Sequence, residues 1–174
     1  MPAMLTAKII VMGPPNSGCR EMLATIAQGT GASASATGER ALEFRRWELS
    51  PDLRIQFYGV VAHLTLEFAW PTICKGLSGA VATCDAAAPE SVERAAQVVH
   101  FLTSTFKAPV VVAAGGVGQA GALSLDAVRQ QLQVPEEIPV LPCRFQDWAS
   151  VKQVLMVLFY AIRGRIERDQ GTAQ

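Results

Sequence analysis

Residues 13–20 read GPPNSGCR and directly follow a short apolar run. A loop that cradles phosphate has the pattern G-x-x-x-x-G-K-[ST], in which the lysine reaches the phosphates and the hydroxyl binds magnesium. Gly13 and Gly18 stand at this spacing, but Cys19 takes the lysine position and Arg20 the hydroxyl position. A thiol has no fixed positive charge and a guanidinium is not a metal ligand. The segment therefore has the frame of a phosphate loop without its charge and metal chemistry.

Residual anion binding is still expected at this loop, because backbone N–H groups at the start of a helix favour an anion. We expect at most weak binding of phosphate, sulfate or a guanine nucleotide, and no metal. The vestigial loop consists of Gly13, Asn16, Ser17, Gly18, Cys19 and Arg20. Alternatively, the segment is only a strand-to-helix turn with two glycines. Cys19 is either a buried, inert thiol or a reactive one whose pKa the helix start lowers.

The composition favours a parallel sheet. Half of the residues are apolar and 17% are charged, where roughly a quarter is usual. Strands buried on both faces read as continuous apolar runs. With 15 basic and 15 acidic residues, the chain has no basic excess for nucleic acid. No apolar run is long enough to span a membrane, and the four cysteines form no C-x-x-C pair, so we expect reduced thiols in a cytoplasmic protein.

Periodicity and turn residues predict an alternation of strands and helices along the chain. The expected strands are 8–12, 41–49, 53–60, 77–84, 109–114 and 138–142. The expected helices are 20–28, 64–75, 89–106, 124–131 and 147–168, and residues 29–38 are expected to form a loop. This order predicts an α/β fold with a mostly parallel six-stranded sheet, one antiparallel edge strand and helices on both faces. We expect a single domain over 1–174, with its ordered core at about 7–168.

A phosphate loop after the first strand, one hairpin and then alternating units resemble the Ras-like small GTPase fold. The segments at 75–102 and 134–159 look like scaffold parts of the bacterial MglA-like group and of the signal recognition particle receptor beta subunit. The resemblance covers about residues 7–166. It implies a P-loop nucleotide-binding scaffold, but scaffold segments imply fold and not activity.

The nucleotide motifs of this family are altered along the whole chain. Neither Thr30 nor Thr37 has the context of the metal-binding threonine. In the motif after the third strand, Ala62 stands where a glycine would contact the γ-phosphate, and His63 where a glutamine would position water. The base-reading N-K-x-D motif becomes glycine at its three defined positions, Gly115, Gly116 and Gly118. The last motif is reduced to Pro142-Cys143-Arg144.

These departures predict a pseudo-GTPase: a small-GTPase-like domain without catalysis that acts as a regulatory or signalling scaffold through protein contacts. The resemblance implies a partner-facing surface around residues 39–48 and 60–70, and a Roadblock-type small protein or a second copy as the partner. The candidate partner-binding residues are Phe44, Arg45, Arg46, Trp47, His63, Leu66 and Trp70. These residues could instead pack against the chain's own sheet. The other functional hypotheses are a divergent GTPase with partner-assisted hydrolysis and a thiol-dependent regulator acting through Cys19.

Overall fold

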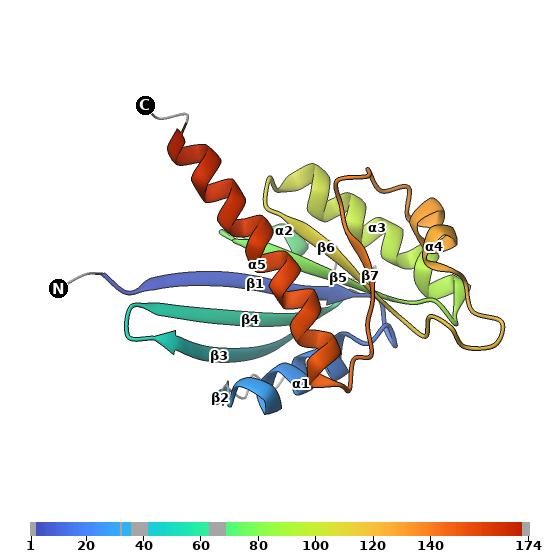
Figure 1. Ribbon diagram of the computed structural model, residues 1–174, viewed down its shortest axis with the longest axis horizontal. Helices are drawn as coiled ribbons and strands as arrows, with labels where there is room; N and C mark the ends of the chain where they lie inside the picture. Colours follow the sequence, from blue (N-terminus) through green and yellow to red (C-terminus); the bar gives the residue numbers. More distant parts are fainter. Residues whose placement is uncertain (1–2, 32, 36–41, 63–68, 172–174) are drawn as a thin grey trace.

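The protein is an α/β domain built on one twisted sheet, as the computed structural model shows in Figure 1. The structure describes residues 3–31, 33–35, 42–62 and 69–171. Its strands are β1 (Leu5–Gly13), β2 (Ser33–Ser35), β3 (Leu42–Ser50), β4 (Leu53–Val61), β5 (Gly79–Asp85), β6 (Val110–Gly115) and β7 (Val140–Pro142). Its helices are α1 (Cys19–Thr30), α2 (Trp70–Ile73), α3 (Pro89–Thr105), α4 (Leu125–Leu132) and α5 (Trp148–Gly171).

The sheet has the order β2-β3-β4-β1-β5-β6-β7, with β1 at its centre. β1 pairs in parallel with β4 and β5, and β5, β6 and β7 continue the parallel pairing. The second half of β1 and all of β6 are buried, as expected for strands covered on both faces. The carboxyl ends of β1, β5, β6 and β7 therefore meet at one edge, where open α/β sheets bind ligands.

The predicted hairpin and the predicted fold class are confirmed. β3 and β4 are antiparallel and are joined by a tight turn at Pro51-Asp52. The structure adds a seventh strand, because β2 pairs with residues 44–46 of β3 and so lies outside the expected edge strand. β2 has only three residues and lies in a segment rich in Gly, Ala and Ser, which favours a loop by sequence alone.

Helices cover both faces of the sheet and enclose two separate apolar cores. α1 and α5 pack on one face around Ile9, Val11 and Phe57. α3 and α4 pack on the other face, and the short α2 brings Trp70 into the same core. Because successive side chains of a strand point to opposite faces, neighbouring residues of β1 belong to different cores.

One expected helix, 64–75, is much shorter in the part that the structure describes. Residues 64–68 lie outside the described residues, and α2 covers only Trp70–Ile73 with Pro71 in its first turn. Among the described helices, none is both long enough and apolar enough to cross a membrane.

Candidate functional site

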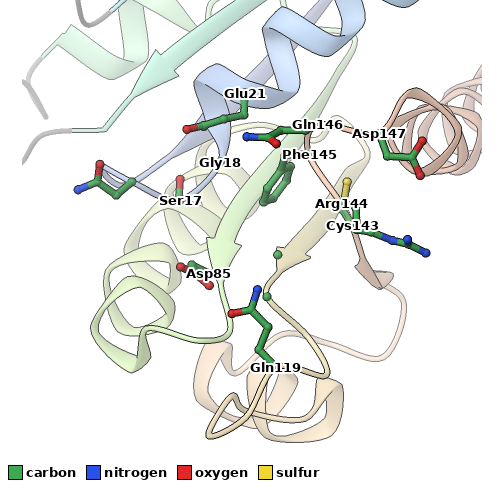
Figure 2. Close-up of a pocket in the computed structure, with 13 residues that line it drawn as sticks. Ser17, Gly18, Glu21, Asp85, Gln119, Cys143, Arg144, Phe145, Gln146 and Asp147 are labelled. Atoms are coloured by element: carbon green, nitrogen blue, oxygen red, sulfur yellow. The ribbon is translucent and has the colours of Figure 1, made fainter.

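A cavity of about 520 Å³ lies at the carboxyl ends of β1, β5, β6 and β7, next to the vestigial phosphate loop. It is lined by Asn16, Ser17 and Gly18 from the loop, by the ends of β5 and β6, and by the segment 143–147 that leads into α5. Figure 2 shows that these side chains come from separate parts of the chain. The fold therefore brings the segment expected to be a vestigial phosphate loop and the segments expected at the base-reading positions together around one space.

The loop is held by a contact between the side chain of Ser17 and that of Thr83 in β5. The hydroxyls of Ser17 and Thr83 are 2.7 Å apart, and both residues are buried. A Cβ on Gly13 would lie 2.0 Å from Thr83 Oγ1 and 2.4 Å from Ser17 Oγ. Only glycine therefore fits at position 13, because this hydroxyl pair passes directly over it. Gly18 has φ +96°, a backbone conformation that favours glycine.

Cys19 is turned into the core rather than toward the cavity. Its thiol is 3% exposed and donates a hydrogen bond to the carbonyl oxygen of Val11, with Sγ···O 3.1 Å. Burial raises the pKa of this thiol from its ordinary value of 9.0 to about 12. The start of α1 therefore does not activate Cys19, and the position of the phosphate-reaching lysine carries a neutral side chain. The following residue, Arg20, is exposed.

The backbone N–H at the expected γ-phosphate position is already used inside the protein. Ala62 donates its N–H to the carbonyl oxygen of Gly13, with N···O 2.7 Å. This bond continues the parallel pairing between β1 and β4 by one residue. An amide that completes the sheet is not available to a phosphate oxygen.

Phe145 fills the space at the end of β6 where the base-reading motif would begin. A Cβ on Gly115 would lie 2.5 Å from Cε2 of the Phe145 ring, and a Cβ on Gly18 would lie 2.1 Å from its Cδ2. The ring therefore lies against both glycines, between the phosphate loop and β6. Gly118, at the position where the resemblance would place the guanine-binding aspartate, has φ +88°, and a Cβ on it would meet no described atom within 4 Å.

The charges around the cavity are unfavourable for a polyphosphate. Among the described residues that line it, Glu21, Asp85 and Asp147 are acidic and Arg144 is basic. Asp85 Oδ1 accepts a hydrogen bond from the N–H of Ala87, with N···O 2.9 Å, which keeps this carboxylate at the end of β5. Like charges repel, so an excess of carboxylates opposes a polyanion. Within the described residues, no group of three or more His, Cys, Asp and Glu side chains is placed to hold a metal ion.

The four candidate partner-binding residues of β3 point to two faces of the sheet. The Phe44 and Tyr58 rings are 4.9 Å apart, and the Arg46 guanidinium lies 5.9 Å from the centre of the Phe44 ring. Trp47 packs instead into the core under α1 and α5. Arg45, on the same side as Trp47, pairs with Glu43 at 3.4 Å. Because successive side chains of a strand point to opposite faces, Phe44 and Arg46 share one face of the sheet, and Arg45 and Trp47 share the other.

The remaining candidate residues for partner binding are partly outside the described chain. His63 and Leu66 lie in the segment 63–68, which the structure does not describe. Trp70 is described and is 2% exposed, and its ring meets that of Phe101 edge-on with 5.4 Å between centroids. In this structure Trp70 is therefore part of the core and not of an exposed surface.

Two residues that organise the site, Thr83 and Phe145, were not identified from the sequence. Thr83 interrupts an otherwise apolar strand, and this isolated hydroxyl was the available signal. Phe145 follows the expected last strand by three residues, in a segment whose contacts depend on the folded arrangement of three distant parts of the chain. No protein-family model matches this chain, and no curated protein matches it in sequence.

Proposed function

We propose that this protein is a pseudo-GTPase, a small-GTPase-like domain that does not turn over nucleotide and acts through contacts with other proteins. The observation that carries the proposal is the state of Cys19. The lysine position of the phosphate loop holds a buried thiol that donates to a strand carbonyl, so the loop lacks the cation that a triphosphate requires.

The persistence of the loop glycines is explained without a nucleotide. Gly13 is needed because the Ser17–Thr83 hydroxyl pair leaves no room for a side chain. Gly18 is needed because of its positive φ and because the Phe145 ring lies against it. Both glycines of the motif thus serve the turn from β1 into α1, and selection for the turn suffices to keep them.

The β3–β4 face carries the features of a contact surface. The rings of Phe44 and Tyr58 are in contact there, flanked by Arg46 and by Lys8, whose Nζ lies 4.8 Å from the centre of the Tyr58 ring. Aromatic rings and arginine are enriched at protein interfaces. We propose that a partner protein docks on this face, and by the family resemblance that partner is a Roadblock-type small protein or a second copy of the chain.

Thermal melting with and without millimolar Mg-GTP and Mg-GDP tests the loss of nucleotide binding. A ligand present at 100 times its Kd stabilises the folded state by about 2.7 kcal/mol. For a domain of this size that corresponds to a rise in Tm of about 5–11 °C. We expect no rise, and we expect none in a Cys19→Lys, Arg20→Ser variant, because the Ala62 N–H stays bonded to Gly13 and the Phe145 ring still lies against Gly18 and Gly115. A rise of several degrees in the natural protein would refute the pseudo-GTPase assignment and favour a divergent GTPase.

Site-specific photo-cross-linking tests the contact surface. A photoreactive residue at Arg46 is compared with one at Arg163, an exposed residue on α5 on the other side of the sheet. We expect a discrete cross-linked product from position 46 alone, identified by mass spectrometry as either a second copy or another protein. The same products from both positions would show that this face is not a specific surface.

A further inference from the structure

Phe145 lines the candidate site between the phosphate loop and β6, although no nucleotide motif calls for an aromatic residue there. It belongs to the segment 143–147 between β7 and α5. Figure 2 shows its ring beside Gly18, with Gln146 close to the ring and Asp147 farther away. The ring also packs on the apolar core under α1 and α5.

The backbone that carries the ring is fixed by hydrogen bonds to three other elements. The Thr25 hydroxyl on α1 donates to the carbonyl oxygen of Phe145. Cys143 donates its N–H to Ala114 of β6, with N···O 2.9 Å, and Arg144 donates its N–H to Ser150 Oγ of α5, with N···O 2.9 Å. These bonds fix the backbone from which the ring projects, and the ring itself is held by its packing.

The ring fills side-chain space that two glycines leave empty. Its Cε2 lies 2.5 Å from where a Cβ on Gly115 would stand, and its Cδ2 lies 2.1 Å from where a Cβ on Gly18 would stand. Real Cβ atoms do not approach other atoms this closely. With the ring in this place, neither Gly18 nor Gly115 can carry a side chain. The phosphate loop and the end of β6, distant in sequence, are therefore joined through one aromatic side chain.

We propose that Phe145 is a positioning residue of the site: its ring takes the side-chain space between Gly18 and Gly115 and joins the phosphate loop to β6 and α5. The proposal rests on the proposed function for the identity of the site and adds which residue holds its two sides together. The space that the ring vacates would accept a small, flat and uncharged aromatic compound. The carboxylates of Glu21 and Asp85, which line the adjoining cavity, disfavour an anionic ligand there.

A mutant cycle between positions 115 and 145 tests the proposal through thermal melting. Gly115 does not have a positive φ, so Gly115→Ala changes the occupied space without backbone strain. We expect Gly115→Ala to lower Tm by several degrees in the natural background, because the new methyl group meets the ring. In a Phe145→Ala background, which has a lower Tm of its own, the same methyl group should raise Tm. Equal effects of Gly115→Ala in both backgrounds would overturn the proposal.

Binding of indole gives a second readout. Indole should raise the Tm of Phe145→Ala and leave the natural protein unchanged. Phe101→Ala is the matched control, because it removes a ring of the same size from the core on the other face. No effect of indole on Phe145→Ala, or an equal effect on Phe101→Ala, would contradict an aromatic-shaped space at position 145. If Phe145→Ala does not fold, the cycle is run with Phe145→Leu. In that background Gly115→Ala should lower Tm less than it does in the natural protein, or should raise it.

The two proposals fail separately. A rise of the natural protein's Tm with Mg-GTP would refute the pseudo-GTPase assignment whatever the cycle shows. An additive cycle would refute the role of Phe145 even if the natural protein binds no nucleotide.

Discussion

The buried hydroxyl pair of Ser17 and Thr83 gives a quantitative test of how the phosphate loop is held. Ser17 is 1% exposed and Thr83 is not exposed, and their oxygens are 2.7 Å apart. Ser17→Ala leaves the Thr83 hydroxyl without this partner, and Thr83→Val leaves the Ser17 hydroxyl without it. A buried polar group that loses its partner costs about 1–3 kcal/mol.

Each single variant should therefore lower the free energy of unfolding by about 1–3 kcal/mol, which corresponds to a fall in Tm of about 2–12 °C for a domain of this size. The double variant removes both hydroxyls, so no polar group of the pair stays buried alone. Its loss should be smaller than the sum of the two single losses by at least about 1 kcal/mol.

Urea titrations of the four proteins at a fixed pH measure this coupling. Thr105→Val, at the last residue of α3, is a control for an exposed threonine and should change stability by less than about 0.5 kcal/mol. Additive losses in the Ser17 and Thr83 variants would show that the hydroxyls do not support one another. The explanation for Gly13 would then fail as well, because it depends on their pairing beside that glycine.

Three other results are expected. Trp70→Ala should cost about 3–5 kcal/mol in urea unfolding because it empties a core position, whereas Trp70→Phe should cost much less because an aromatic ring still fills that position; equal costs would contradict this. Iodoacetamide near neutral pH should leave Cys19 unlabelled in the native protein by mass spectrometry, because burial raises its pKa to about 12, and rapid labelling would restore the hypothesis of a reactive thiol. Stability should fall as pH rises above 9, because the unfolded chain ionises Cys19 and Cys84 near 9.0 while burial holds both native pKa values at about 12. This stabilisation is complete below pH 9, and above pH 9 the free energy of unfolding falls by about 1.4 kcal/mol per pH unit for each thiol. A Cys19→Ala, Cys84→Ala variant should show a smaller fall per pH unit. An unchanged slope would contradict the assignment.

Much of the fold could be predicted because it depends on local patterns. The apolar runs of β5 and β6 and the Pro51-Asp52 turn are readable within short windows, and the order of these elements gives the sheet. β2 was missed because its three residues have no strand propensity of their own, and it forms only by pairing with β3. The extent of α5 to Gly171 was underestimated by three residues, since the polar end of the helix resembles a frayed tail.

The site was predicted less completely, because its contacts join distant residues. The absence of the motif lysine could be read directly from Cys19, but the thiol's bond to Val11 and its raised pKa follow from burial. The split of Phe44 and Arg46 from Arg45 and Trp47 was available in principle from strand alternation. The ring of Phe145 beside Gly18 and Gly115 was not, because it depends on how α5 and β6 end relative to the phosphate loop.

Equilibrium dialysis of the purified protein with labelled GTP and GDP, in the presence of magnesium, tests the central claim most directly. It measures occupancy without reliance on a change in stability. The buried thiol at the lysine position, the engaged Ala62 amide and the ring at Gly115 predict no saturable binding at micromolar nucleotide. Saturable binding of one nucleotide per chain with a micromolar Kd would contradict the account.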